Sequence, residues 1–181
     1  MALNATVYAF TIDLADSDRD LYTTLELRVA RHPSETGEYL LTRVLAYCLE
    51  YDEGIAFSNG LSDPDQPAIH IRDLTGALHT WIDVGAPEAA RLHRAGKAAQ
   101  RVVVYTHKDP EQLAARLAGE RIHRVDALKL YAVDRAWLGA VAERLTRRMS
   151  FTLTVSERHL YLSLGEMTLS GVIREIPIQA S

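Results

Sequence analysis

Two runs of alternating apolar and polar residues at the start of the chain constrain its fold most. Residues 5–14 set small or polar residues between larger apolar ones, and in residues 21–31 the apolar Leu25, Leu27 and Val29 alternate with charged side chains. A period of two is typical of a strand that buries one face. Because a short polar cluster separates the two runs, the pattern predicts an antiparallel hairpin.

Helical and strand patterns alternate along the rest of the chain. In chain order we expect a helix from the N-cap Ser34 to about Glu50, strands at 55–58, 68–73 and 78–84, a helix opened by Pro87, a strand at 101–106, a helix from Asp109 to 117, a strand at 125–133, a helix from Asp134 to about 145, and a β-rich C-terminal section. This order predicts one mixed α/β (α+β) domain over residues 1–181, with a mixed β-sheet flanked by helices.

Composition excludes several classes of protein. The 181 residues include one cysteine, Cys48, which rules out a disulfide framework and disfavours a cysteine-based zinc site. No apolar run approaches the roughly 20 residues of a membrane span. The N-terminus lacks the pattern of a signal peptide, so we expect a cytoplasmic protein without a membrane partner. A net charge of −4 disfavours a broadly basic nucleic-acid coat but leaves room for a local basic patch.

Two aspartates are candidates for a metal site. Asp73 ends one predicted strand and Asp83 ends the next, with a turn between them. We expect the ends of paired strands to come close, where two carboxylates could share Mg²⁺ or Mn²⁺. The alternative is that Asp73 only starts its turn and Asp83 only ends its strand, which aspartate commonly does.

Glu38 is a third candidate ligand. It precedes Leu41 by three residues and Leu45 by seven, which places it on the apolar stripe of the first predicted helix. A buried carboxylate is costly unless it is paired, neutral or bound to a metal. The alternative is that Glu38 occupies the first turns of the helix, where solvent and the helix dipole compensate its charge.

The second predicted helix carries the basic residues. His93, Lys97 and Gln100 share one face, and a lysine beside a metal can stabilise charge that develops on an attacking water or a phosphate. Arg91 and Arg94 belong to the same cluster and are candidate contacts to a phosphate backbone. The alternative for all of them is a solvated polar helix face.

The chain resembles the YaeQ family of small bacterial proteins over essentially its whole length. The resemblance is specific in four places, namely residues 1–8, the segment Ala30-Arg-His-Pro-Ser-Glu-Thr36, the segment Trp81-Ile-Asp-Val-Gly-Ala-Pro87, and the helix with Arg91 and Lys97-Ala98. This family is similar to the PD-(D/E)XK nucleases, whose restriction-endonuclease-like core is a helix, a mixed sheet with a central hairpin, and a second helix. The resemblance implies such a core at about residues 34–106.

The resemblance also implies roles for individual residues. Glu38 resembles the acid of the first core helix, Asp73 the aspartate of the hairpin, and Asp83 the first residue of the D/E-x-K element, and together they would bind the metal. Gly85 stands where that element has lysine, so Lys97 would replace it in catalysis. Arg91, Arg94 and Gln100 would bind substrate. Gln100 and Tyr105 loosely resemble a Q-x-x-x-Y element, one residue too far apart.

Two functions follow from these residues. The first is a metal-dependent phosphodiesterase or nuclease acting on nucleic acid, in which Mg²⁺ or Mn²⁺ activates a water. The second is a binding protein that keeps the nuclease scaffold without its chemistry and contacts nucleic acid or a protein of the transcription or repair machinery. The enzyme requires Glu38, Asp73 and Asp83 in one metal shell with Lys97 beside it.

Overall fold

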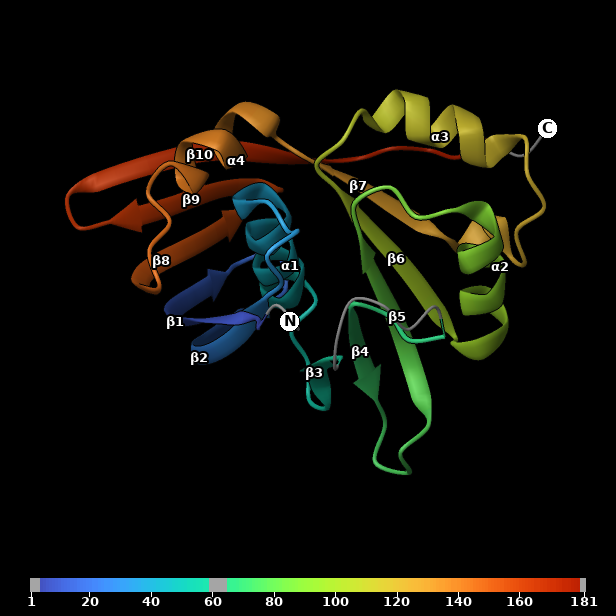
Figure 1. Ribbon diagram of the computed structural model, residues 1–181, viewed down its shortest axis with the longest axis horizontal. Helices are drawn as coiled ribbons and strands as arrows, with labels where there is room; N and C mark the ends of the chain where they lie inside the picture. Colours follow the sequence, from blue (N-terminus) through green and yellow to red (C-terminus); the bar gives the residue numbers. More distant parts are fainter. Residues whose placement is uncertain (1–3, 59–64, 180–181) are drawn as a thin grey trace. The chain divides into compact units, whose positions relative to one another are not determined.

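The computed structural model describes residues 4–58 and 65–179 (Figure 1). The chain has a mixed α/β fold and divides into two compact units. Each unit is built from two separate stretches of sequence, Met1–Leu41 with Val133–Ile173 and Thr42–Ala132 with Arg174–Ser181. The core predicted at residues 34–106 therefore draws on both units.

The first unit contains a mixed sheet in the order β2-β1-β8-β9-β10. Its strands are β1 (Thr6–Asp16), β2 (Leu21–Arg31), β8 (Arg148–Ser156), β9 (His159–Leu164) and β10 (Met167–Glu175), the last of which ends in the second unit. The β1–β8 pair is parallel and the other pairs are antiparallel. The predicted N-terminal hairpin and β-rich C-terminal section are confirmed.

Helix α4 (Arg135–Ala142) covers one face of this sheet. The Asp134 carboxylate accepts a hydrogen bond from the Trp137 backbone N–H at 3.0 Å, so Asp134 is the N-cap that the sequence predicts. The Trp137 indole donates to the Leu169 carbonyl oxygen at 3.0 Å. A Cβ atom at Gly171 would lie 2.6 Å from the Trp137 side chain, so the helix can approach β10 this closely only over glycine.

Helix α1 (Gly37–Leu49) begins later than the sequence predicts. Its N-cap is Thr36, whose hydroxyl accepts from the Tyr39 N–H at 3.1 Å. The predicted cap, Ser34, instead lies 2.6 Å from His32 Nδ1. Glu35 is buried before the helix and accepts from the His32 N–H at 3.2 Å, so the expected N-cap was wrong by two residues.

The second unit contains a sheet in the order β3-β4-β5-β6-β7. Its strands are β3 (Ile55–Phe57), β4 (Ile69–Arg72), β5 (Leu78–Val84), β6 (Arg101–Thr106) and β7 (Lys129–Val133), the last residue of which is assigned to the first unit. The β3–β4 and β4–β5 pairs are antiparallel, and the β5–β6 and β6–β7 pairs are parallel. The strand predicted from residue 125 begins at Lys129, because residues 125–127 form a 3₁₀ turn.

Helices α2 (Ala89–Ala98) and α3 (Pro110–Ala118) pack on the same face of this sheet (Figure 1). Leu92 of α2 and Leu117 of α3 are buried in one cluster with Val104 of β6 and Leu130 of β7. The helix predicted to open at Asp109 is present as α3, and Asp109 caps it by accepting from the Gln112 N–H. No helix in the described part of the chain is long and apolar enough to cross a membrane.

Candidate functional site

The end of β5 buries the carboxylate of Asp83. Strand alternation places Asp83 and Trp81 on the face that α2 covers. Arg91 of α2 donates from Nε to Asp83 Oδ2 at 2.7 Å and from Nη2 to Oδ1 at 3.0 Å, a bidentate ion pair. The Ala68 N–H donates to Oδ1 at 3.3 Å. The negative charge of Asp83 is therefore already compensated within the protein.

Arg91 makes two further contacts. Its Nη2 donates to the Gln66 carbonyl oxygen at 2.6 Å, and its Cζ lies 5.2 Å from the centroid of the Trp81 ring, in a cation–π contact. These contacts join β5, α2 and the segment before β4. The sequence predicted Arg91 as a contact to substrate, whereas the structure places its guanidinium against Asp83.

Asp73 lies at the opposite end of the hairpin from Asp83. The register pairs Arg72 with Leu78 at the turn, whereas Asp83 accepts from Ala68 at the start of β4. Five residues of strand separate the two positions, about 17 Å. The expectation that the two aspartates meet was wrong, because in an antiparallel hairpin the end of one strand lies beside the start of the next.

The Asp73 carboxylate serves the turn itself. Its Oδ1 accepts from the Thr75 hydroxyl at 2.5 Å, the Thr75 N–H at 2.9 Å and the Ala77 N–H at 3.0 Å. These hydrogen bonds, that from the Thr75 hydroxyl first, hold the pKa of this exposed carboxyl below its ordinary value. The turn alternative from the sequence accounts for all of these contacts.

Glu38 lies in the first turn of α1 and is partly exposed. It belongs to the first unit, whereas Asp73 and Asp83 belong to the second. Over residues 4–58 and 65–179, no three His, Cys, Asp or Glu side chains are grouped so that they could hold a metal ion. The described residues therefore do not form the Mg²⁺ or Mn²⁺ site that the sequence predicts.

Lys97 is exposed on α2 and lies on a different side of the helix from Arg91. The two residues are six positions apart, which corresponds to about 9 Å along the helix axis and a rotation of about 240°. Because Arg91 is the residue that contacts Asp83, Lys97 points to a different side. The predicted place of Lys97 beside a metal at Asp83 does not agree with this geometry.

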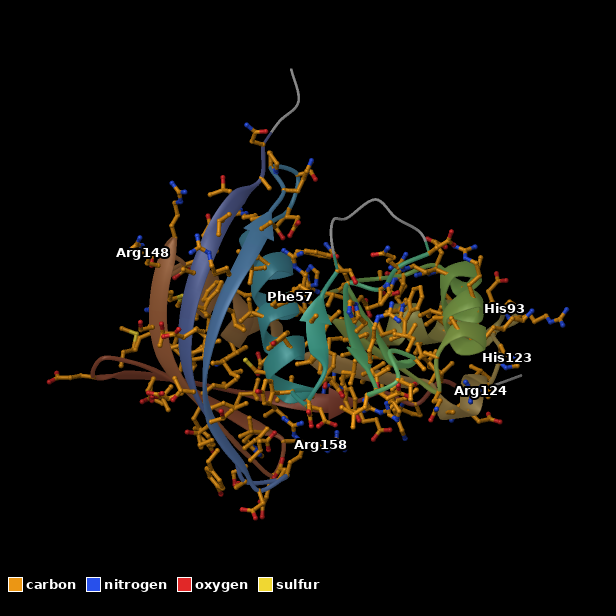
Figure 2. The ribbon with its side chains drawn as sticks, turned by 90° about the horizontal axis from the view of Figure 1, so that it is seen from below. Phe57, His93, His123, Arg124, Arg148 and Arg158 are labelled. Atoms are coloured by element: carbon orange, nitrogen blue, oxygen red, sulfur yellow. The ribbon has the colours of Figure 1, made fainter. Side chains whose placement is uncertain are left out.

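Lys97 belongs instead to a group of basic residues, here named the α2 basic cluster. It consists of His93, Arg94, Lys97, Arg121 and His123. The His93 and His123 rings lie edge to face with centroids 6.2 Å apart, and the His123 N–H donates to His93 Nδ1 at 3.0 Å (Figure 2). Arg94 makes a long ion pair of 3.9 Å with Asp65.

The charges of this cluster act on its histidine. Desolvation, and then the positive charges of Lys97, Arg121 and His123, lower the pKa of His93 below its ordinary value of 6.5. A group whose protonated form is disfavoured by neighbouring cations lies in a positive potential. The α2 basic cluster therefore provides a site that would attract an anion.

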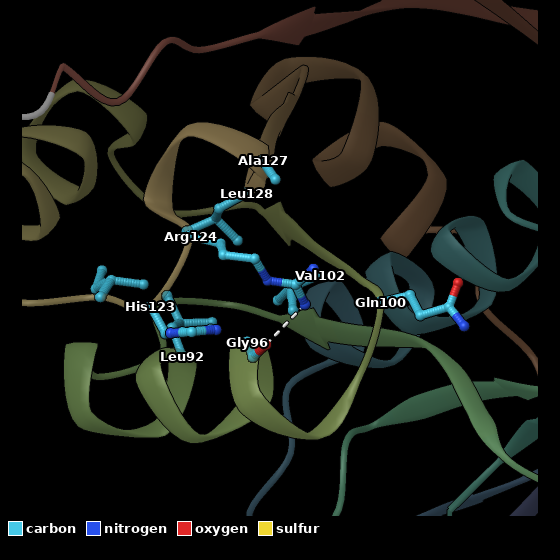
Figure 3. Close-up of a pocket in the computed structure, with 9 residues that line it drawn as sticks. Leu92, Gly96, Gln100, Val102, His123, Arg124, Ala127 and Leu128 are labelled. Carbon is cyan, nitrogen blue, oxygen red and sulfur yellow. Dashed lines mark hydrogen bonds between the residues drawn. The ribbon is translucent and has the colours of Figure 1, made fainter.

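Arg124 closes the C-terminal end of α2. It adopts a left-handed conformation, with φ of 52°, and its Nη2 donates to the Gly96 carbonyl oxygen at 2.8 Å (Figure 3). The same Nη2 donates to the Ala99 carbonyl oxygen at 2.5 Å. A Cβ atom at Gly96 would lie 2.5 Å from the His123 carbonyl oxygen, so only glycine permits this close approach. Gly96 lies within α2 and is buried.

The space beside Arg124 is small. Its volume is about 10 Å³, room for no more than about one water molecule. Gln100 lines it, but its amide group points away from Arg124 and His123 (Figure 3). The role of Gln100 in binding substrate stays a prediction.

A second ion pair, which the sequence predictions lack, buries the carboxylate of Glu50. On the face of β6 opposite α2, Arg101 Nη1 donates to Glu50 Oε2 at 2.5 Å and the Tyr105 hydroxyl donates to Glu50 Oε1 at 2.7 Å. The Tyr105 ring stacks on Tyr131. A signal was present, because Arg101 and Tyr105 share one face of a strand that is otherwise apolar and so require a polar partner.

Comparisons place the chain among known proteins. The family model described as YaeQ protein matches residues 1–172. The Uncharacterized protein YaeQ of Escherichia coli (strain K12) is 30% identical over 164 residues, which are 90% of this chain and 91% of that protein. The protein of the same description from Salmonella typhi shows the same identity and coverage.

Two crystal structures resemble the chain along nearly its whole length. The YaeQ protein from Xanthomonas axonopodis pv. citri is 29% identical with a TM-score of 0.86, and the match covers 98% of this chain and 99% of that one. The YaeQ protein from Pseudomonas syringae is 27% identical with a TM-score of 0.87, and covers 98% of both chains. Sequence and structure agree that the chain belongs to the YaeQ family.

Proposed function

We propose that this protein binds the phosphate backbone of nucleic acid through the α2 basic cluster, on a scaffold that resembles the PD-(D/E)XK nucleases without their metal chemistry. The observation that carries the proposal is the contrast between Asp83 and Lys97. Arg91 and the Ala68 N–H occupy the Asp83 carboxylate, whereas Lys97 is exposed on α2.

The order of elements supports a restriction-endonuclease-like scaffold. Helix α1, the antiparallel strands β3 to β5, helix α2 and the buried strand β6 follow one another as in the core that the family resemblance implies. A scaffold does not determine its chemistry. Within the described residues of the second unit, Asp73 and Asp83 are too far apart to share an ion.

The α2 basic cluster has the chemistry that a phosphate contact needs. Arg94 and Lys97 are three residues apart, so they are neighbours on the helix surface. Both are exposed, and the guanidinium of Arg121 adds a third positive charge to the same region. Basic side chains of this kind hold a nucleic-acid backbone without reading its sequence.

Binding can be measured by fluorescence anisotropy with labelled single- and double-stranded DNA and RNA. We expect Lys97→Glu to weaken binding about tenfold or more, because it removes one phosphate contact and adds a repulsive charge. The matched control is Lys108→Glu, which makes the same charge change at an exposed position before α3. Equal affinities of the two variants would contradict the proposal.

The same samples test the enzyme. Each nucleic acid is incubated with the protein and Mg²⁺ or Mn²⁺, beside an Asp83→Ala variant whose fold is checked by circular dichroism. We expect no metal-dependent cleavage. Cleavage that requires the metal and disappears in Asp83→Ala would overturn the non-catalytic proposal and establish a phosphodiesterase centred on Asp83.

A further inference from the structure

The sheet of the first unit turns one face to solvent. In β1 the even-numbered Phe10, Ile12 and Leu14 are buried, while the odd-numbered residues from Val7 to Asp13 are exposed or partly exposed. The exposed residues of β2 and β8 lie on the same face, because the register pairs them with the odd-numbered residues of β1. This outer face is the one that α4 does not cover.

Arginines flank a small residue at one end of this face. Ala9 pairs with Arg28 of β2 on one side and with Arg148 of β8 on the other. The two arginines are therefore two strand spacings apart, about 10 Å between Cα atoms, with a methyl group between them. Figure 2 shows the side chain of Arg148 standing out from the ribbon near the start of β8.

These residues form an open groove of about 740 Å³, here named the arginine groove. It is lined by Val7, Ala9, Thr11, Arg28, Arg147, Arg148, Met149 and Ser150. Within the described part of the chain, no ion pair joins Arg28, Arg147 or Arg148 to an acidic side chain. Three arginines that form no ion pair with the described residues thus line one groove.

One acidic residue of the hairpin lies in the row next to these arginines, and the others lie further along the strands. The nearest acid by register on the outer face is Glu26, which pairs with Thr11. Asp13 lies one pair further along and accepts from the Thr24 hydroxyl at 2.8 Å. At the far end of the hairpin, Asp16 is paired with Arg19 and Asp18 accepts from the Glu157 N–H. With three arginines against the single neighbouring carboxylate of Glu26, the arginine groove is positive although the whole chain carries a net charge of −4.

We infer that the arginine groove is a second binding surface for the phosphodiester backbone of double-stranded nucleic acid. Arginine binds phosphate through paired N–H donors, and the hydroxyls of Thr11 and Ser150, which pair with each other in the next row, are further donors of the kind that phosphates accept from. Among the described residues that line the groove there is no aromatic ring. The groove therefore lacks the aromatic side chains on which the unpaired bases of a single strand would stack.

This inference rests on the proposed function for the choice of nucleic acid as partner, and it adds a surface in the other unit. The test measures binding of a labelled DNA duplex to three altered proteins. The first carries Arg28→Gln and Arg148→Gln, the second carries Lys97→Glu, and the third, a control in the first unit, carries Arg135→Gln at an exposed position in the first turn of α4. Thermal unfolding by circular dichroism checks each fold.

We expect the double groove variant to bind more weakly and to depend less on salt. Two lost phosphate contacts lower the slope of log K against log salt by about 2, so raising salt from 50 to 200 mM weakens the unaltered protein about tenfold more than it weakens the variant. Arg135→Gln should leave affinity and slope unchanged. A double variant that behaves like Arg135→Gln would overturn the inference.

The outcomes for the two surfaces are separate. Loss of binding in the groove variant alone supports the arginine groove and contradicts the α2 basic cluster, and loss in Lys97→Glu alone does the reverse. A protein that binds single strands but no duplex contradicts the arginine groove alone, and a protein that binds neither contradicts both surfaces. The last measurement uses labelled polyglutamate. If this polymer binds in a way that depends on Arg28 and Arg148, and duplex does not, the inference is overturned in favour of an acidic protein partner.

Discussion

The two faces of the second unit's sheet each bury a carboxylate against an arginine, and the two pairs differ in what they connect. Asp83 and Arg91 are eight residues apart and belong to consecutive elements, β5 and α2. Glu50 and Arg101 are 51 residues apart and join the end of α1 to β6. Glu50 also accepts from the buried Tyr105 hydroxyl, whereas Asp83 accepts from a backbone N–H. The pair at Glu50 is thus a tertiary cross-link, and the pair at Asp83 is local.

The largest effect is expected from Glu50→Ala. This change leaves the Arg101 guanidinium and the buried Tyr105 hydroxyl without their acceptor, so the free energy of unfolding should fall by about 2–4 kcal/mol. Urea unfolding measures it. The control, Glu53→Ala, alters an exposed glutamate three residues away and should change stability by less than about 0.5 kcal/mol. Similar values for the two variants would show that the cross-link adds nothing to stability.

A smaller loss is expected from Asp83→Ala, about 1–3 kcal/mol. The Arg91 side chain is 25% exposed and keeps its contacts with the Gln66 carbonyl oxygen and the Trp81 ring, so water and these groups replace part of what Asp83 provided. The same unfolding measurement compares the two pairs directly. If Asp83→Ala costs more than Glu50→Ala, the local pair is the stronger of the two.

The sequence predicted the local features better than the tertiary ones. The hairpin and the caps Asp109 and Asp134 depend on neighbouring residues, and all of them are present in the structure. Glu50 was missed because its partners lie more than 50 residues away, and no spacing in one sequence shows which distant strand a helix will cover.

The predicted metal site was wrong for the same reason, because it depended on tertiary contacts. The strand ends at Asp73 and Asp83 were placed correctly, but their separation depends on which end of a hairpin each residue occupies. Arg91 was recognised as basic, yet the sequence did not show that it folds back onto Asp83 rather than outwards. Lys97 is exposed, as its solvated alternative predicts.

Tyr105→Phe should have a smaller effect on the cross-link, about 1 kcal/mol, because one hydrogen bond is lost while the ion pair stays. Burial first, and then the charge and hydrogen bond of Glu50, raise the pKa of Tyr105 well above 10.0. The unfolded chain therefore releases this proton first, and the contribution of Tyr105 is present below pH 10 and falls as the pH rises further. Unfolding at several alkaline pH values should show this fall, and Tyr105→Phe should reduce it. Burial also raises the pKa of Tyr47, so its part of the fall remains in the variant. Tyr22→Phe, at a side chain that is 63% exposed, is the control.

The smallest effect is expected at the α2 basic cluster. In the two buried pairs a carboxylate faces an arginine, whereas in this cluster positive charges face one another. Since desolvation and the charges of Lys97, Arg121 and His123 lower the pKa of His93 below 6.5, the contribution of His93 to stability is present above that value and is lost as the pH falls through the folded pKa. Lys97→Ala removes one repulsive charge, so NMR titration of the imidazole should give a higher pKa that still lies below 6.5. Lys108→Ala should leave this pKa unchanged.

A bound phosphate backbone would raise the pKa of His93 further, because an anion favours the imidazolium. If the pKa of His93 stays the same in Lys97→Ala and on addition of duplex, the positive charges of α2 do not act on His93. That result would contradict the proposal that the α2 basic cluster contacts phosphate.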